Sequence, residues 1–322
     1  MLLRIKRFLI DTYKTIKIYK FYSLRVKEKK HDKILVSMID GRIKHGGLSD
    51  RLYGIISAFK YCQEHKINFR INWIYPFSLA TFLEPNQYDW RINPDDISYN
   101  LLVASPKYVS MVYYDIDKMK KYCDKKFSFQ KKQLHLYSNT ITFTKEEFQF
   151  FFNILFKKSE LLNKALRKEI TNIGKEYISI TFRFQQLLGD FKEDGFQTLN
   201  QNDQRKLINS CLECIEKLYQ KYQKRILVTS DSITFLKEAE SHFPYVYIIH
   251  GSMVHIDYVL KESPENTETY LKSFIDLFML ANAEIIFLAN FLPLYASGFA
   301  KLASWINGRE YHAINEELEI IE

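Results

Sequence analysis

The second half of the chain alternates short apolar runs with longer segments in which apolar residues recur at helical spacing. The apolar runs are YISITFRF (177–184), RILVTS (225–230), YVYII (245–249) and EIIFLA (284–289). The segments with helical spacing are 203–223, 233–242, 268–283 and 297–306. Short apolar strands that alternate with helices indicate a parallel sheet whose two faces are both covered by helices.

The first half of the chain begins with the same pattern. ILVSMI (34–39) and INFRINW (67–73) have the character of buried strands, and LYGIISAFKYCQEH (52–65) between them has helical spacing. Together they predict a βαβ unit. Residues 75–140 are irregular in pattern and rich in polar residues and tyrosine.

A long helix is expected between the two strand-containing regions. It begins at Thr144, whose spacing to Glu147 fits a capping box, and extends to about Thr171. A chain of 322 residues is long enough for two domains. We therefore predict an α/β protein with two Rossmann-like parallel-sheet domains, an N-terminal one at 31–160 and a C-terminal one at 161–322.

Residues 1–30 account for the net positive charge of the chain. The chain carries 46 Lys and Arg against 38 Asp and Glu, and ten of these basic residues but only two acidic ones lie in residues 1–30. The neutral remainder argues against a nucleic-acid groove within the fold. The segment reads as a basic amphipathic helix that either binds an anionic membrane surface or packs on the domain. Its apolar side comprises Leu2, Ile5, Phe8, Leu9, Tyr13, Ile16 and Tyr19.

The four cysteines are too scattered for a disulfide framework. Cys211 and Cys214 form a C-x-x-C within a predicted helix, on the same face as Leu207 and Leu218, so we expect core packing rather than redox or metal chemistry. The sequence shows no uninterrupted apolar run of about 18 residues and no secretory leader. A cytoplasmic location is the expectation.

Glycines are scarce, yet several gather in one predicted strand-to-helix turn. The chain has ten glycines, and Gly41, Gly46, Gly47 and Gly54 all lie within IDGRIKHGGLSDRLYGI (39–55). A glycine turn before a helix offers backbone amides and the positive end of the helix dipole to an anion or a hydroxyl-rich group. An ordinary tight turn is the alternative interpretation.

Charged side chains follow the strand at 177–184. Arg183 stands at its end, where a guanidinium could bind a diphosphate and neutralise a leaving group, or could form a buried ion pair with Asp190 or Asp231. Asp190 and Glu193 are candidates for a general base, or are solvated loop acids.

Other strand ends carry polar side chains as well. Asp231 and Ser232 end a strand and open a helix, so they are either site residues or part of a helix N-cap. His255 and Asp257 follow the strand at 245–249 and are either site residues or a local hydrogen-bonded pair. All four lie where ligands bind in parallel sheets, at the carboxyl ends of strands.

The order of these loops resembles that of the α1,2/α1,6/protein-O-fucosyltransferase group. GGLSDRL (46–52) is similar to its G-G-L-G-N-R/Q-L turn, and ISITFRFQQLLGD (178–190) to its strand carrying H-x-R. ILVTSDS (226–232) resembles its T/S-D-D/S strand end. FIDLFMLANAEIIFLAN (274–290) followed by SGFAKLAS (297–304) resembles its closing segment. The four motifs occur in the family's order over about 260 residues.

The resemblance implies a GT-B fold, with two facing Rossmann-like domains, and a nucleotide sugar, GDP-fucose in the family, bound mainly by the C-terminal domain. It further implies that Arg183 holds the β-phosphate. By position, the residues lining the nucleotide pocket would be Asp231, Ser232, Asp276 and Ser297, with Gly46, Gly47 and Arg51 closing it from the N-terminal, acceptor-side domain. Thr181 stands where the family usually has the histidine of H-x-R.

These features lead to the hypothesis of an inverting, metal-independent glycosyltransferase of bacterial surface-polysaccharide synthesis. Its partners would be a nucleotide sugar, a glycan or lipid-linked oligosaccharide and the inner membrane face, with no cofactor beyond the donor. One alternative is a metal-dependent sugar transferase that uses the D-x-D formed by Asp115 and Asp117. Another is a non-catalytic carbohydrate-binding protein of the membrane surface.

Overall fold

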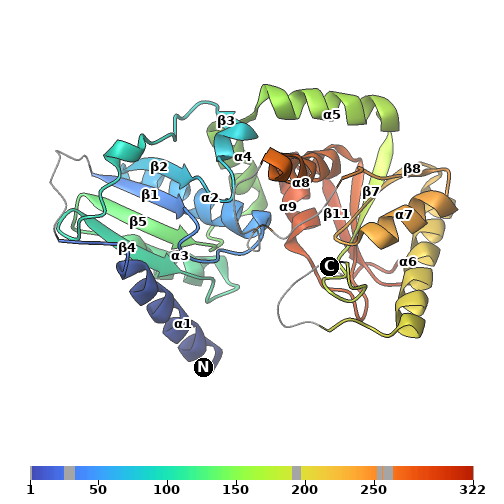
Figure 1. Cartoon of the computed structure of the whole chain (residues 1–322), viewed down its shortest axis with the longest axis horizontal. Coiled ribbons are helices and arrows are strands. Elements are labelled where there is room, and N and C mark those ends of the chain that lie inside the picture. Colours follow the sequence, from blue (N-terminus) through green and yellow to red (C-terminus); the bar gives the residue numbers. More distant parts are fainter. Residues whose placement is uncertain (1, 25–32, 191–196, 252–255, 257–263, 322) are drawn as a thin grey trace. The chain divides into compact units, whose positions relative to one another are not determined.

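The computed structural model describes residues 2–24, 33–190, 197–251, 256 and 264–321. The chain divides into two compact units, Met1–Lys157 and Lys158–Glu322, called unit 1 and unit 2 below. Each unit contains one parallel sheet with helices packed against it (Figure 1). Within the described residues, no helix combines the length and the apolar character needed to cross a membrane.

Unit 1 is built on a four-stranded sheet. Its order is β2 (Asn68–Trp73), β1 (Ile34–Ile39), β5 (Gln133–Ser138) and β4 (Ala104–Val109), and all of its pairings are parallel. Every residue of β1 and β5 is buried, which is why β1 reads as an uninterrupted apolar run in the sequence. Helix α2 (Leu48–His65) packs on β1, β2 and β5, and α1 (Leu2–Tyr19) packs on β4.

The segment 75–140 has more regular structure than its pattern predicts. Besides β4 and β5 it contains α3 (Ile116–Phe127), the short strand β3 (Leu83–Pro85) and the 3-10 turns Leu79–Thr81 and Pro94–Asp96. Strand β4 reads ASPKYV and lies at the edge of the sheet, where a proline is tolerated and one row of residues meets solvent. Its polar composition is therefore that of an edge strand.

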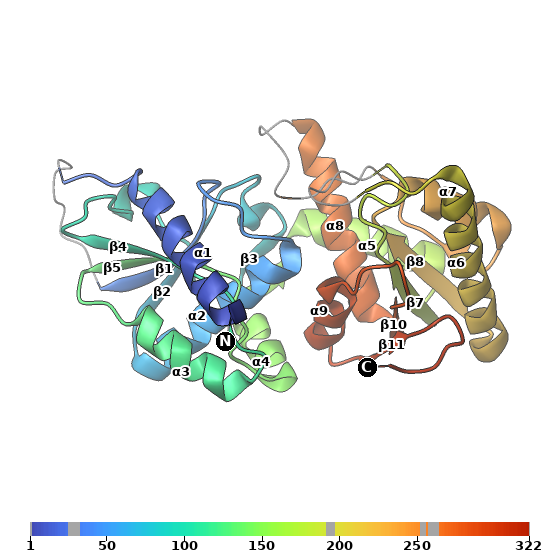
Figure 2. The same cartoon turned by 90° about the horizontal axis from the view of Figure 1, so that it is seen from below.

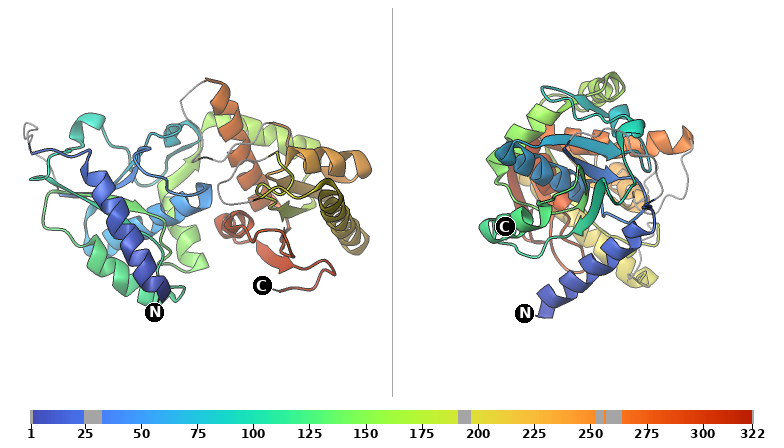
Figure 3. Two further views of the ribbon diagram at one scale, coloured as in Figure 1. Left: turned by 60° about the horizontal axis from the view of Figure 1, so that its bottom comes forward. Right: turned by 90° about the vertical axis from the view of Figure 1, so that its left-hand side faces the viewer.

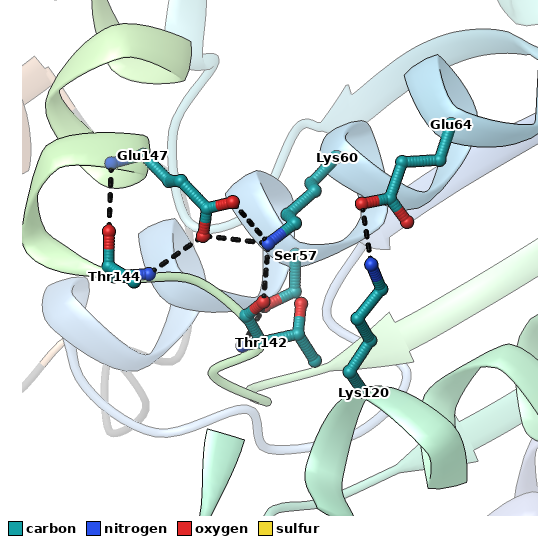
Figure 4. A network of polar contacts seen from close by, with 7 residues as sticks. All are labelled: Ser57, Lys60, Glu64, Lys120, Thr142, Thr144 and Glu147. Carbon is teal, nitrogen blue, oxygen red and sulfur yellow. Dashed lines mark hydrogen bonds and ion pairs between the residues drawn. The ribbon is translucent and has the colours of Figure 1, made fainter. Parts of the chain in front are cut away.

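The single long helix predicted from Thr144 to Thr171 is wrong. The capping box is confirmed, because Glu147 N donates to Thr144 Oγ1 at 3.3 Å and Thr144 N donates to Glu147 Oε2 at 2.9 Å (Figure 4). The helix that it starts, α4, ends at Leu155 (Lys145–Leu155). Strand β6 (Phe156–Lys158) pairs with β3. It separates α4 from α5 (Glu160–Ile173), whose own N-cap is Ser159.

Unit 2 is built on a five-stranded parallel sheet. Its strands in spatial order are β11 (Glu310–Ile314), β10 (Ile285–Ala289), β7 (Tyr177–Phe182), β8 (Arg225–Ser230) and β9 (Val246–Tyr247). The helices that alternate with them are α6 (Gln201–Tyr222), α7 (Ile233–His242), α8 (Pro264–Asn282) and α9 (Gly298–Ile306). The predicted alternation is confirmed, and β11 is an additional strand that the sequence pattern did not predict.

The strand order of unit 2 places a topological switch point beside β7. From β7 the chain proceeds outward through β8 to β9, then returns to the other side of β7 to form β10 and β11 (Figure 2). Strands β7 and β10 are adjacent, and the loops that follow them lead away in opposite directions. Open parallel sheets bind ligands at such a point.

The core of unit 2 includes the two cysteines of the C-x-x-C. Cys211 and Cys214 have no exposed surface and lie in one apolar cluster with Leu207 and Leu218. Burial raises the pKa of the Cys214 thiol to about 12. The prediction of core packing is thus confirmed.

Candidate functional site

Arg183 and Asp231 form an ion pair at the switch point of unit 2. Arg183 follows β7 directly and Asp231 follows β8, and the distance from Arg183 Nη1 to Asp231 Oδ2 is 2.9 Å. The carboxylate also accepts hydrogen bonds from Phe184 N at 2.8 Å and Gln185 N at 2.7 Å. Of the two partners predicted for Arg183, the structure selects Asp231.

The environment of this pair differs between its two members. The Asp231 side chain is 5 % exposed and the Arg183 side chain is 20 % exposed. Burial raises the pKa of Asp231, while the charge of Arg183 and the two backbone N–H groups act in the opposite direction. A guanidinium carries five N–H donors, so an ion pair on one edge is compatible with a phosphate on another. Asp231 therefore orients a partly exposed cation.

The loop after β10 brings a helix N-terminus to the same place. Tyr295 N donates to Arg183 O at 3.0 Å, which joins the two loops that diverge at the switch point. Two residues further on, Ser297 caps α9, and its Oγ accepts from Phe299 N at 3.2 Å. The N-terminus of α9 carries partial positive charge and follows Tyr295 by three residues, so it starts close to the loop that carries Arg183.

Ser232 and Asp190 cap helix α7. Ser232 has no exposed surface; its Oγ accepts from Phe235 N at 3.1 Å and donates to Asp190 Oδ2 at 2.8 Å. Asp190 Oδ2 also accepts from Thr234 N at 2.8 Å. The N-cap interpretation of Ser232 is confirmed, and Asp190 gains a capping function that the sequence analysis did not predict. Its action as a general base stays a prediction.

Asp276 lies in a buried ion pair on helix α8. Lys272 Nζ is 2.7 Å from Asp276 Oδ2, and the two side chains are 4 % and 7 % exposed. Asp276 Oδ1 is buried and has no hydrogen-bond partner within the part of the chain that the structure describes. Burial raises the pKa of Asp276, and the charge of Lys272 opposes that shift. The remaining oxygen can accept an N–H group from a ligand.

Lys272 is a residue that sequence reasoning missed. It lies against the segment after β9, because a Cβ added at Gly251 would be 3.1 Å from its Cδ. The signal was present in the sequence as a Lys and an Asp four residues apart on one helix, a spacing that places them on the same face.

The glycine turn of unit 1 is shaped by its own side chains. Gly46 has a φ of 101°, in the region that favours glycine, and Gly47 is the N-cap of α2. Gly47 N donates to Asp50 Oδ2 at 3.2 Å. The Arg51 side chain is buried and donates from Nε to Gly46 O at 3.2 Å and from Nη1 to Tyr75 O at 3.0 Å. Arg51 thus stabilises the turn, and its contact with a nucleotide stays a prediction.

A buried polar network follows β1 in unit 1. Asp40 comes directly after the strand, accepts from Tyr137 Oη at 3.0 Å and lies 3.3 Å from Arg42 Nη1. The Arg42 guanidinium stacks 3.8 Å from the centre of the Tyr99 ring. Burial raises the pKa of Asp40 despite the nearby cation. The sequence analysis missed this network, although Asp40 is the first polar residue after a buried strand.

The remaining sequence predictions lie elsewhere. Glu193, His255 and Asp257 fall outside the described residues. Asp115 is the N-cap of α3, where Oδ1 accepts from Lys118 N at 2.9 Å, and Asp117 lies in the first turn of that helix. In the described ranges, no group of three or more His, Cys, Asp or Glu side chains is arranged to hold a metal ion.

Comparisons with known proteins give no match by sequence and clear matches by structure. No protein-family model and no curated protein matches the chain. The NodZ α-1,6-fucosyltransferase from Bradyrhizobium, soaked with GDP-fucose, aligns with a TM-score of 0.56 and 14 % identity over 88 % of this chain and 95 % of NodZ.

Two further solved structures also align with this chain. A mutant of Arabidopsis thaliana FUT1 in complex with GDP aligns with a TM-score of 0.52 and 14 % identity over 94 % of this chain and 74 % of its own. POFUT1 in its apo form gives 0.51 and 10 % identity over 89 % and 99 %. The chain therefore has the α/β fold with parallel sheets of the GT-B fucosyltransferases.

Proposed function

We propose that this protein is a glycosyltransferase that transfers fucose from GDP-fucose to a glycan acceptor. One observation carries the proposal: a partly exposed arginine, oriented by a buried aspartate, lies at the switch point of a Rossmann-like sheet, and the loop that leads into helix α9 bonds to its backbone. Arginine and a helix N-terminus are the groups that proteins use to bind phosphate. The shared fold of the fucosyltransferases supports the same function.

The reaction that fits these groups is a direct displacement at C1 of the donor sugar. The acceptor hydroxyl attacks C1 as the bond from C1 to the diphosphate oxygen breaks, and the diphosphate leaves with the electron pair. Arg183 and the N-terminus of α9 would stabilise the negative charge on the leaving group without a metal ion. The acceptor proton would pass to a carboxylate, with Asp190 the first candidate and Glu193 the second.

Asp276 supports a base that donates an N–H group, as guanine does. Its Oδ1 is buried and has no hydrogen-bond partner among the described residues, so a ligand that donates an N–H there removes the cost of a buried acceptor without a partner. Guanine presents two adjacent N–H donors on one edge and uracil presents one between two carbonyls, so the preference for guanine rests on the ligands of the similar structures. GDP or GDP-fucose is the ligand of two of them.

We propose that the acceptor is a glycan or lipid-linked oligosaccharide of surface-polysaccharide synthesis. This protein would act on it while bound peripherally at the inner membrane face. The basic residues of the N-terminal segment favour an anionic surface. Aromatic side chains in 75–140, among them the exposed Tyr114, are suited to stacking on sugar rings.

Thermal unfolding with GDP, UDP and CMP tests the donor class. A nucleotide at one hundred times its dissociation constant adds about 2.7 kcal/mol to the free energy of unfolding. We expect GDP to raise the melting temperature more than UDP or CMP, and release of GDP from GDP-fucose to resist EDTA. If no nucleotide shifts the melting temperature, the proposal is wrong. Activity lost with EDTA and in Asp115→Ala would favour the D-x-D alternative instead.

A further inference from the structure

Helix α1 packs on unit 1 through its more polar side and leaves its apolar side in solvent. Ile18 and Asp11 are buried against the sheet. The side chains that face away, called the α1 face here, are 41 % to 60 % exposed; they are Phe8, Leu9, Tyr13, Ile16 and Tyr19. Large apolar residues gathered on one exposed helix face are unusual in a monomer and mark an interaction surface.

The helix is held to unit 1 by specific polar contacts. Both Asp11 oxygens bind Ser110, with Oδ1 accepting from Ser110 Oγ at 2.6 Å and Oδ2 from Ser110 N at 3.1 Å. Thr15 Oγ1 accepts from Tyr108 N at 3.1 Å, and Lys14 Nζ donates to Tyr108 Oη at 2.9 Å. These bonds fix the rotation of α1 about its own axis. The exposure of the α1 face is therefore set by the packing.

The same packing removes negative charge from the exposed side. Asp11 is the single acidic residue of α1, and it is buried in the contact with Ser110. Exposed basic side chains border the α1 face, namely Arg7, Lys17 and Lys20. From helix α3, Lys126 Nζ lies 5.4 Å from the centre of the Phe8 ring. The surface is thus apolar along its middle and basic at its margin.

We propose that the α1 face is a docking surface for an anionic phospholipid membrane. Apolar side chains would enter the interface between headgroups and acyl chains while the basic margin contacts lipid phosphates, each Lys or Arg contributing about 1 kcal/mol. Since α1 is already folded against β4, binding does not have to order a free peptide. The N-terminal part of α1 extends beyond the sheet of unit 1 (Figure 3).

A second copy of the chain is a poorer occupant of this surface. In a two-fold dimer the same patch faces itself, so the basic margins of the two copies would lie opposite each other. Like charges in such a position are destabilising. An anionic membrane complements both the apolar middle and the basic margin, and this inference is independent of the enzymatic proposal.

Co-sedimentation of the full chain with vesicles tests the inference. We expect binding to phosphatidylcholine vesicles that contain phosphatidylglycerol to be at least about tenfold tighter than to phosphatidylcholine alone. The double variant Phe8→Ser, Ile16→Ser and the double variant Lys17→Glu, Lys20→Glu should each lose at least about tenfold of that binding. Phe150→Ser removes an equally exposed aromatic residue from α4 and should bind as the unchanged protein does.

Three results would overturn the inference. The first is equal binding to both kinds of vesicle or to neither, and the second is equal loss in Phe150→Ser. The third is self-association of the unchanged protein that Phe8→Ser, Ile16→Ser abolishes without any vesicle binding, which would assign the α1 face to a second copy. Circular dichroism of the same variants shows that they are folded. Stabilisation by GDP is measured separately, so failure of the donor-site proposal leaves this test unaffected.

Discussion

Individual residues in unit 2 combine structural and candidate chemical functions. Asp190 is the clearest case, because the sequence marks it as a candidate general base and the structure places it in a helix cap. Its Oδ2 accepts hydrogen bonds from Ser232 Oγ and Thr234 N at the N-terminus of α7. A carboxylate in that position is stabilised by the N-terminal partial charge of the helix. The structure thus predicts a measurable contribution of Asp190 to stability.

Asp190→Asn tests that contribution. The substitution removes the charge next to the helix N-terminus and weakens the acceptor, so we expect the free energy of unfolding to fall by about 1 kcal/mol. Chemical denaturation measures this free energy, with Asp203→Asn, which also removes a charge from a helix N-terminus, that of α6, as a comparison. An unchanged stability in Asp190→Asn would contradict the capping function. The turnover rate of the folded variant then decides whether Asp190 also acts as a base.

The sequence predicted the need for a partner at Arg183 but not which partner. A guanidinium after a buried strand needs a negatively charged partner, a diphosphate or a carboxylate, and both Asp190 and Asp231 were candidates for the carboxylate. The selection depends on strand order, because Asp231 follows β8, the strand paired with β7 along its length. Sequence spacing carries no information on strand order. For the same reason the contact between Tyr295 and Arg183 could not be foreseen.

Helix α2 is positioned by a close backbone approach and by a buried lysine. A Cβ added at Gly54 would lie 1.8 Å from Ser138 O, so the helix and the end of β5 are in contact through the glycine. Six residues further along the helix, Lys60 Nζ donates to Thr142 O at 3.0 Å and to both Glu147 oxygens (Figure 4). The capping box of α4 and the position of α2 are therefore coupled.

Gly54→Ala should be strongly destabilising because the added methyl overlaps a backbone carbonyl. We expect a loss of about 3 kcal/mol, measured by chemical denaturation. Gly47→Ala, at the N-cap of the same helix, is the matched control. Gly47 has a φ of −67° and nothing within 4 Å of an added Cβ, so its loss should be about 1 kcal/mol or less. Equal effects of the two substitutions would show that the approach to Ser138 is not close.

The ion pair of Lys60 and Glu147 predicts a pH dependence of stability. Burial raises the pKa of Glu147, but the hydrogen bonds from Lys60 and Thr144 and the charge of Lys60 leave it below its ordinary value of 4.5. A carboxyl with a lowered pKa in the folded state stabilises above its ordinary pKa, and that stability is lost as the pH falls below 4.5 towards the folded pKa.

Comparison of the unchanged protein with Glu147→Gln isolates this contribution. Glu147 is 39 % exposed, so we expect Glu147→Gln to be less stable by about 1 kcal/mol at pH 7. Denaturation at a series of pH values should show the difference shrinking below pH 4.5, where the carboxyl of the unfolded chain begins to protonate before that of the folded protein. A difference that stays constant down to acid pH would contradict the assignment.

On the scale of the whole molecule, the sequence predicted the α/β class and the positions of most buried strands along the chain. Strands β1 and β7 are fully buried and β8 is buried beyond Arg225, so their sequences are mostly apolar and their pattern is strong. Strand β5 is also fully buried, but half of its sequence QLHLYS is polar, and it was missed together with β4 at a sheet edge and β11 with its polar start. The break between α4 and α5 was missed although the polar residues KKSE (157–160) interrupt the apolar spacing and Ser159 is a residue type typical of a helix N-cap.

The central claim is that Arg183 binds the diphosphate of a guanine nucleotide sugar at the switch point of unit 2. Isothermal titration calorimetry with GDP tests it on three proteins: the unchanged chain, Arg183→Ala and Arg225→Ala. Arg225 lies at the opposite, amino-terminal end of the neighbouring strand, where its Nη1 donates to Asn172 O at 2.7 Å, so it controls for loss of one positive charge.

The account predicts that GDP binds the unchanged chain and Arg225→Ala equally. It predicts that Arg183→Ala loses at least about a hundredfold in affinity, since charge-assisted bonds to a phosphate are removed. GDP binding by Arg183→Ala within about threefold of the unchanged chain, a difference below 1 kcal/mol, would contradict the claim.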